Sequence, residues 1–328
     1  MASQYRSRPG IGRIFLVGDA AHRIPPWGAL GLNTGIQDAS NLVWKLDFAL
    51  RRSSSAEDYN VLLDTYDTER RPIGRRVGLT SLHSLRSHSD VMDRALGVVP
   101  SNSVVENVAA MNAFLDPTSS GGNEKRKAVV QAQKVLDNEF HALGAEVGWF
   151  YPDIRVDEEE DEGTVSRHGG QLLENGVLDC INYHLSTIPG HHLPHVWLRK
   201  KRETGGARVS TRDLVERDRF LLLTRDMKQW KDFARDLVHV EGICDGTDTE
   251  KSDDYVDVDG RWAKLCGVSK TGAVLVRPDG IVAWRARDSD GMSLERMQDV
   301  LRRILKLNET MTIEGDGQES GQSVLAKL

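Results

Sequence analysis

Cysteine is scarce in this 328-residue sequence, which contains only Cys180, Cys244 and Cys266. The three are far apart, and no two of them form a C-x-x-C pair. The sequence therefore gives no support to a disulfide framework, a zinc ribbon or a dithiol redox site. We expect three free thiols, either packed or exposed.

Long apolar runs are also absent. No run approaches the roughly 20 residues that a membrane-spanning helix needs, and the start lacks a charged segment followed by an apolar core. We expect neither a membrane span nor a signal peptide, and hence a cytoplasmic protein. The formal net charge of −6 gives no general attraction to nucleic acid or to anionic membranes. With 39% hydrophobic and 28% charged residues, the chain can form two modest domains with real cores.

The most informative segment is 13–46, RIFLVGDAAHRIPPWGALGLNTGIQDASNLVWKL. Its apolar run Ile14–Val17 predicts a strand that ends just before Asp19, and the Pro25-Pro26 turn then leads into an amphipathic helix. The first turn of a helix has unpaired N–H groups and the positive end of the helix dipole. This arrangement suits a ligand that presents hydroxyl groups to Asp19 and an electron-rich edge to the helix start.

The segment resembles the second FAD-binding motif of class A flavoprotein monooxygenases, specifically the phenol hydroxylase and dichlorophenol hydroxylase branch. The matching residues are GDAAH at 18–22, Pro25-Pro26, Gly28, GLNTG at 31–35, QDA at 37–39 and NLVWKL at 41–46.

The resemblance implies a role for each part of this motif. Asp19 would accept a hydrogen bond from the ribityl hydroxyls of FAD, and the amides of residues 31–33 would face the pyrimidine edge of the flavin ring. Pro25 and Pro26 would hold rigid backbone beside the ring. The candidate FAD-binding residues are Gly18, Asp19, Ala20, His22, Pro25, Pro26, Gly28, Gly31, Leu32 and Asn33.

Several of these residues have simpler alternatives. Asp19 could cap the turn that follows it, and His22 could either pack beside the cofactor or satisfy local backbone groups. Asn33 could be a helix N-cap and a flavin-facing residue at once. Ala29 stands where the family commonly has a second glycine, so a positive φ there would cost roughly 1 kcal/mol.

Parts of the family pattern are missing. Its dinucleotide fold opens with a strand, a G-x-G-x-x-G turn and a helix, whereas residues 9–12 have glycines without a preceding strand and residues 28–35 have the wrong spacing. The substrate-binding sheet that precedes the GDAAH segment is not found either. We therefore expect the C-terminal portion of such a monooxygenase, which alone should bind FAD poorly.

The remainder of 1–150 is predicted to be helical, as the C-terminal part of the FAD-binding domain. Apolar spacing predicts a helix over 34–52 with Ile36, Ala39, Leu42, Val43, Leu46 and Leu50 on one face. A second helix is expected over 59–89, where Tyr66 and the ERRP run resemble the family and Pro72 should kink or interrupt the helix. Further helices are expected over 101–115 and 124–143, separated by a loop at 117–122.

Residues 151–188 are predicted to form a linker. Its acidic run 157–162 lacks apolar periodicity, so a solvated loop explains it better than a metal site.

A second match begins the next domain. The run PGHHLPHVWL at 189–198 resembles the opening of the thioredoxin-like C-terminal domain of the same hydroxylases. Its His191, His192 and His195 suggest a metal site, but Pro194 breaks helical ligand spacing and the family run predicts a surface turn. We expect Trp197, like Trp44, to lie in a core.

This domain, 189–308, is predicted to follow a thioredoxin-like order of strand, helix, strand, strand, helix. The elements are a strand at 220–224, a helix at 228–238, a hairpin over 273–285 that turns at 278–280, and a helix at 293–307 with Leu294, Met297, Val300, Leu301 and Ile304 on its apolar face. Residues 309–328 are predicted to be a disordered tail.

The fold class expected is therefore α/β: a partial FAD-binding, Rossmann-like domain that is largely helical here, followed by a thioredoxin-like domain. The resemblance implies a FAD-dependent monooxygenase that uses NADPH or NADH to hydroxylate a phenolic or related aromatic substrate. No residue is nominated as a catalytic acid or base or as a metal ligand. The alternative is a non-enzymatic thioredoxin-like interaction or oligomerisation module with a relic flavin segment. A homodimer through the thioredoxin-like domain is a further expectation.

Overall fold

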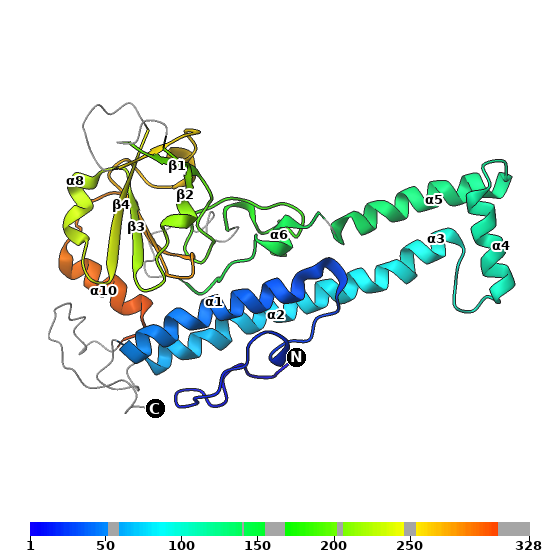
Figure 1. Ribbon diagram of the computed structural model, residues 1–328, viewed down its shortest axis with the longest axis horizontal. Coiled ribbons are helices and arrows are strands. Elements are labelled where there is room, and N and C mark those ends of the chain that lie inside the picture. Colours follow the sequence, from blue (N-terminus) through cyan, green and yellow to red (C-terminus); the bar gives the residue numbers. More distant parts are fainter. Residues whose placement is uncertain (52–58, 140, 155–167, 202–205, 246–253, 308–328) are drawn as a thin grey trace. The chain divides into compact units, whose positions relative to one another are not determined.

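The computed structural model describes residues 1–51, 59–139, 141–154, 168–201, 206–245 and 254–307 (Figure 1). These residues fall into two compact units. The first contains Met1–Tyr151 and the described part of Glu159–Leu185, and the second contains the described residues from Ser186 onward with those of Pro152–Glu158. The predicted α/β class, with a largely helical first part, is confirmed.

The first unit is built around two long helices, α1 (Leu30–Arg51) and α2 (Asn60–Ser87), which lie side by side (Figure 1). After α2 come a π-helix (His88–Asp93) and the helices α3 (Arg94–Leu96), α4 (Val104–Leu115), α5 (Ser120–Leu136) and α6 (Leu143–Glu146). The α4 helix begins at a capping box, in which Ser103 and Glu106 satisfy each other's backbone N–H groups. Short 3₁₀ turns lie at Gly18–Ala20, Trp27–Ala29, Asp137–Glu139 and His168–Gly170.

The second unit is a mixed sheet in the order β2-β1-β5-β4-β3-β6-β7. The strands are β1 (Trp197–Lys200), β2 (Val209–Ser210), β3 (Phe220–Thr224), β4 (Val238–Cys244), β5 (Tyr255–Asp257), β6 (Ala273–Val276) and β7 (Val282–Ala286). The three strands β3, β4 and β5 are parallel, and their other neighbours are antiparallel. The helices are α8 (Met227–Trp230), α9 (Trp262–Leu265) and α10 (Leu294–Ile304), with 3₁₀ turns at Thr211–Leu214 and Lys231–Phe233.

Several predicted elements of the second unit are confirmed. The strand at 220–224 has the predicted bounds, and all of its residues are buried. Leu221 and Leu223, on one face of the strand, pack into an apolar core. The β6–β7 hairpin turns at 278–280, where Asp279 pairs with Arg277. Ser293 caps α10, whose Met297, Val300, Leu301 and Ile304 are buried, although Leu294 is exposed.

Three expectations for the first unit are wrong. Residues 14–17 form no strand, because the backbone around Phe15 pairs only with residues 5–7 in a single bridge. Pro72 does not interrupt α2, since it lies on an exposed side where the carbonyl it leaves unpaired can meet solvent. The loop expected at 117–122 ends early, because Ser119 caps α5 and the glycines that follow it are helical.

Three expectations for the second unit are also wrong. The helix expected over 228–238 is only the short helix α8 followed by a 3₁₀ turn that ends at Phe233. It cannot extend to Val238, because Val238 begins the strand β4, which pairs with β3 in parallel. Trp197 is 40% exposed rather than a core residue. The run at 189–198 is no surface turn, since His191, Leu193 and Val196 are buried and its backbone bonds to residues 280 and 282.

The remaining expectations concern the thiols, the membrane and undescribed segments. Cys180 and Cys244 are half-buried and Cys266 is buried, all as free thiols. No helix among the described residues has both the length and the apolar content needed to cross a bilayer. The acidic run 157–162 and the tail 309–328 lie outside the described residues.

Candidate functional site

Asp19 lies in the 3₁₀ turn Gly18–Ala20, and its side chain is exposed. Gly18 has a φ of +58°, a conformation that glycine adopts without strain. The Asp19 carboxylate makes no hydrogen bond or ion pair to any described residue, and it supplies no side-chain cap to this turn. It is therefore free to accept hydrogen bonds from a ligand.

The first turn of α1 contains three further candidate ligand-binding residues, Gly31, Leu32 and Asn33. The helix begins at Leu30, four residues before the predicted start, so residues 31–33 lie in its first turn, where N–H groups have no partner within the helix. Leu32 is 78% exposed, and Asn33 is also exposed. Ala29, just before this turn, has a φ of +52°, which confirms that this position needs the left-handed conformation.

The proline turn between the two segments is fastened to α2. The Ser81 hydroxyl lies 2.7 Å from the carbonyl oxygen of Pro25 and 2.6 Å from that of Trp27. The Trp27 ring also makes an edge contact with His88, whose Nε2 lies 2.8 Å from Oε2 of Glu139. Pro25 is half-buried and Pro26 exposed, so the turn is rigid and still offers a surface.

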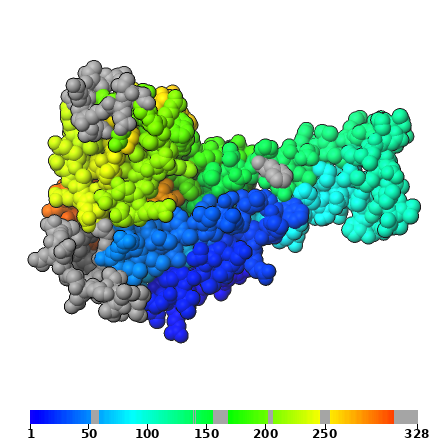
Figure 2. Space-filling view, in the orientation of Figure 1, coloured from blue at the N-terminus to red at the C-terminus, as the bar shows by residue number. Residues whose placement is uncertain are grey.

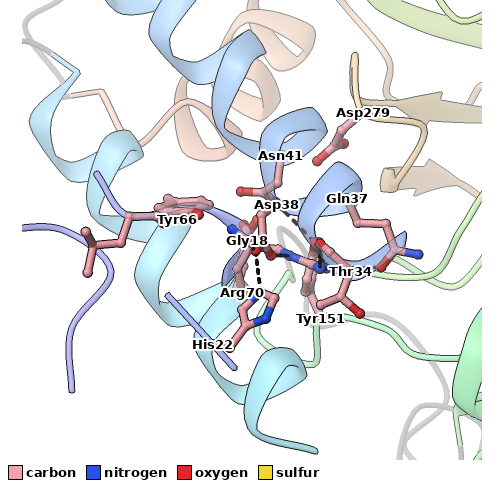
Figure 3. Close-up of polar contacts among 12 residues, drawn as sticks. Gly18, His22, Thr34, Gln37, Asp38, Asn41, Tyr66, Arg70, Tyr151 and Asp279 are labelled. Atoms are coloured by element: carbon pink, nitrogen blue, oxygen red, sulfur yellow. Dashed lines mark hydrogen bonds and ion pairs between the residues drawn. The ribbon is translucent and has the colours of Figure 1, made fainter. Parts of the chain in front are cut away.

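Asp38 is the centre of a buried polar cluster that connects the Gly18–Ala20 turn to α1 and α2 (Figure 3). Its Oδ2 accepts a hydrogen bond from the backbone N–H of Gly18 at 3.2 Å and lies 2.6 Å from Nε2 of His22. Its Oδ1 accepts a hydrogen bond from Nε of Arg70 at 2.8 Å. One carboxylate therefore fixes the turn that presents Asp19.

Arg70 is fully buried and makes further contacts with the first unit. Its guanidinium donates to the Tyr151 hydroxyl at 3.1 Å and to the Thr34 carbonyl at 3.3 Å, and it lies 4.7 Å from the centre of the Trp149 ring. Burial by itself would lower the pKa of Arg70, but Tyr151 and the Asp38 carboxylate raise it above its ordinary value. Arg70 therefore stays charged.

A second buried ion pair lies further along the same two helices. Nζ of Lys45 is 2.9 Å from Oε2 of Glu69, and the Asn41 amide donates to the same oxygen at 2.6 Å. Asn41 also accepts from Lys45 at 2.8 Å and donates to the Tyr151 hydroxyl at 3.2 Å. Buried polar residues of α1 therefore bond to α2 at two positions along the helices.

Two glycines allow the turn to approach α1 closely. A Cβ built at Gly35 would lie 3.1 Å from the Cα of Gly18, which is tighter than an ordinary contact. A side chain at Gly35 would therefore require the turn to shift, whereas Gly18 is favoured by its positive φ.

The candidate residues of the sequence are brought together only in part. Asp19, Leu32 and Asn33 are exposed, whereas His22 is 1% exposed and binds Asp38 rather than local backbone groups. Sequence reasoning missed Asp38, Arg70 and Tyr151. Asp38 and Arg70 are charged residues inside the QDA and ERRP motifs, and this position could have identified them as candidates. Tyr151 lies in no motif, so the sequence contained no signal for it.

A cavity of about 420 Å³ lies beside the start of α1. Its walls include Ala29, Asn33, Ile36, Gln37, Val77 and Trp149, which give it a mostly apolar lining with a few amide groups. Among the described residues, no group of three or more His, Cys, Asp or Glu side chains could hold a metal ion.

The exposed residues fit the flavin end of FAD. A free carboxylate can accept hydrogen bonds from the ribityl hydroxyls, and the start of α1 can stabilise negative charge at the pyrimidine edge. The same carboxylate would repel the pyrophosphate. The site therefore matches the sugar-alcohol chain and the ring rather than the phosphates.

Comparison with known families gives two matches in the order of the chain. Residues 1–80 match the FAD binding domain, and residues 186–306 match the C-terminal domain of aromatic-ring hydroxylases.

Individual relatives agree with these matches. Phenol 2-monooxygenase of Pseudomonas sp. (strain EST1001) is 33% identical over 87% of this chain and 44% of its own length. The 2,4-dichlorophenol 6-monooxygenase of Delftia acidovorans is 31% identical over 93% of this chain and 49% of its own length. The chain thus spans about half the length of the curated relatives it matches.

A solved structure is similar to this chain over most of its length. The flavin-dependent monooxygenase PieE, determined in complex with FAD and substrate, is 33% identical with a TM-score of 0.75. The match covers 93% of this chain and 49% of that one.

Proposed function

Because this chain belongs to the FAD-dependent aromatic-ring hydroxylases, we propose that it forms the flavin-facing and C-terminal part of a monooxygenase that hydroxylates a phenolic or related aromatic ring. The enzyme family of its relatives supports this interpretation and gives no support to a non-enzymatic interaction module.

One observation in the structure carries the proposal. The exposed Asp19 carboxylate has no partner among the described residues, and it lies on a turn that Asp38 and the Gly35 contact hold against α1. An exposed acceptor on a fixed turn, followed by a rigid proline turn and an exposed helix start, is what a ribityl chain and its ring require.

The residues of this chain would bind and orient the cofactor. FAD, when bound, supplies the redox chemistry with NADPH or NADH as the electron donor. Asp19 accepts hydrogen bonds from the ribityl hydroxyls, and the N–H groups of residues 31–33 stabilise negative charge at the pyrimidine edge because they are already oriented. Asp38 keeps the turn of Asp19 in position.

Three further features belong to this proposal. The substrate is a small aromatic molecule, and the protein acts in the cytoplasm. Two copies associate through the thioredoxin-like unit, which sedimentation analysis of the purified chain can test.

The proposal is tested with a chimera, a single polypeptide in which this chain replaces the part of PieE that it covers. We expect the chimera to bind FAD and to oxidise NADH or NADPH faster when phenol or 2,4-dichlorophenol is present, with a hydroxylated product detected by mass spectrometry. The 328-residue chain by itself should not retain stoichiometric FAD. A folded chimera without FAD would contradict the proposal and would favour the interaction module.

A further inference from the structure

The cavity beside the start of α1 has a buried floor and an open mouth. Thr34, Val77 and Trp149, which line it, are buried, whereas Ile36 at its edge is 59% exposed. All of the lining residues belong to the first unit. The segment from the N-terminus to α1, blue in Figure 2, forms part of the surface visible there. A molecule from solvent can therefore enter the cavity and contact the buried side chains.

Arg70 holds the floor of the cavity in place. Its guanidinium donates to the Thr34 carbonyl at 3.3 Å and to Oε1 of Gln37 at 3.4 Å (Figure 3). The same group lies 4.7 Å from the centre of the Trp149 ring. Since Arg70 is also paired with the buried carboxylate of Asp38, one fixed cation positions three of the residues that line the cavity. The cavity is therefore preformed, which lowers the entropic cost of binding a ligand.

Glu146 is the only charged residue among those that line the cavity. It is half-buried at the end of α6, and its carboxylate makes no hydrogen bond or ion pair to any described residue. Asn33 and Gln37 add amide groups to the lining. A carboxylate forms strong hydrogen bonds with donors on a ligand. A hydroxyl is the group that both donates to a carboxylate and accepts from an amide, so the polar part of the lining suits a hydroxylated ligand.

The rest of the lining favours aromatic rings. Leu30, Ile36, Val77 and Val147 contribute apolar side chains, which gain from contact with an apolar ligand. A cavity of roughly 150 Å³ is enough to hold benzene. At about 420 Å³, this cavity has room for two or three fused rings.

We propose that this cavity binds the aromatic substrate of the enzyme as an uncharged hydroxyarene of two or three rings, and that Glu146 selects it. The carboxylate accepts a hydrogen bond from the ligand hydroxyl, and it repels aromatic carboxylates of the same size. This inference rests on the proposed function, because it names the substrate class of that enzyme. Glu146 is a specificity-determining residue in this account, and its role needs no bound FAD.

The test measures binding of three matched probes to the 328-residue chain by equilibrium dialysis at neutral pH. The probes are 2-naphthol, 2-methoxynaphthalene, which lacks the donor, and 2-naphthoate, which carries a negative charge. We expect 2-naphthol to bind at least about tenfold more tightly than either of the others, because a hydrogen bond to a charged group contributes about 1.5–3 kcal/mol. Equal dissociation constants for the three probes, or no saturable binding of 2-naphthol, would overturn the inference.

Two variants show where the probes bind and what selects them. Glu146→Gln keeps an acceptor of similar shape but removes the charge, so 2-naphthoate should bind at least about tenfold more tightly than it does to the wild type. Ile36→Trp should block the mouth and weaken 2-naphthol at least about tenfold. The matched controls are Glu124→Gln, at an exposed position of α5, and Val43→Trp, where Val43 is 58% exposed further along α1.

The controls should leave all three dissociation constants unchanged. If Glu146→Gln discriminates against 2-naphthoate as strongly as the wild type, the carboxylate does not select the ligand. If 2-naphthol binds equally well to Ile36→Trp and Val43→Trp, the ligand does not occupy this cavity. Either result contradicts the proposal, and the result for Glu146→Gln stands even if Ile36→Trp does not fold.

FAD retention by the chimera separates this inference from the proposed function. A chimera that binds FAD, together with a chain that does not select 2-naphthol, leaves the proposed function in place and removes the role of Glu146. Selective binding of 2-naphthol by the chain, together with a folded chimera that lacks FAD, supports the cavity as a ligand site and contradicts the proposed function.

Discussion

Nε of Arg70 lies 2.8 Å from Oδ1 of Asp38, and both side chains are fully buried between α1 and α2. Since the other carboxylate oxygen of Asp38 holds Gly18 and His22, this ion pair connects the fold of the first unit to the turn that presents Asp19. The stability of the helix pair and the geometry of the candidate site therefore depend on the same side chains.

Replacing Arg70 tests this dependence. Arg70→Met should lower the free energy of unfolding by about 3–5 kcal/mol, because it leaves the Asp38 charge buried without its partner. The matched control is Arg71→Met on the next residue of α2, where Arg71 is 42% exposed and pairs with Asp67. The control should cost less than about 1 kcal/mol. Urea unfolding followed by tryptophan fluorescence measures both, and equal losses would contradict the assignment.

Ala29 should be strained by its positive φ. Ala29→Gly should stabilise the protein by up to about 1 kcal/mol, because glycine adopts this conformation without a Cβ clash. Ala109→Gly, at an exposed position inside α4, should instead destabilise by about 1 kcal/mol. Thermal unfolding of the two variants should shift in opposite directions, and a loss of stability in Ala29→Gly would refute the strain.

The close approach of Gly35 to Gly18 gives a third prediction. Gly35→Ala places its Cβ 3.1 Å from the Cα of Gly18, so the turn must move, at an expected cost of about 1–3 kcal/mol. Gly121→Ala in α5 has no atom within 4 Å of the new Cβ and should stabilise by about 0.4–1 kcal/mol. The amide resonance of Gly18 should shift in the first variant only. An unchanged Gly18 resonance in Gly35→Ala would show that the contact does not position the turn.

Asp179 should make the stability of the first unit depend on pH in the acidic range. Hydrogen bonds from the Asn182 backbone and side chain, and from the Ile181 backbone, lower the pKa of Asp179 from 3.8 to about 2. A pKa lowered in the folded state contributes stability above the unfolded value, and this contribution is lost as the pH falls from about 4 toward 2. Asp179→Asn keeps an acceptor oxygen but cannot titrate, so its melting temperature should fall less than that of the wild type over this range. Parallel curves for the two proteins would rule out this role.

Elements with strong local signals could be predicted from the sequence. The strand at 220–224 is a short run of large apolar residues, and the turn at 278–280 has the Asp-Gly pair that favours a hairpin. The left-handed conformation of Ala29 could be predicted because the family commonly has a glycine at this position. In each case the determining residues are neighbours in the chain.

Features set by distant partners could not be predicted in the same way. Periodicity correctly placed Ile36 and Val43 on one face of α1, but it could not show that this face would be exposed. Nor could it show that Asp38 and Lys45 would be buried, because their partners Arg70 and Glu69 lie on α2. The strand β4 was assigned partly to a helix, because only its parallel partner β3 makes Val238 the start of a strand. Tyr151 accepts hydrogen bonds from Arg70 and Asn41, and it lies in a part of the sequence that matches no motif.

The role of Asp19 is tested most directly by the FAD dissociation constant of the chimera, measured by flavin fluorescence. Asp19→Asn removes the charged acceptor and should weaken FAD binding by about 10- to 100-fold, as expected for the loss of a charged hydrogen bond. Asp90→Asn, at another exposed position, should leave the constant unchanged. If Asp19→Asn binds FAD as tightly as the unmodified chimera, the carboxylate does not hold the ribityl chain and the account of the site is contradicted.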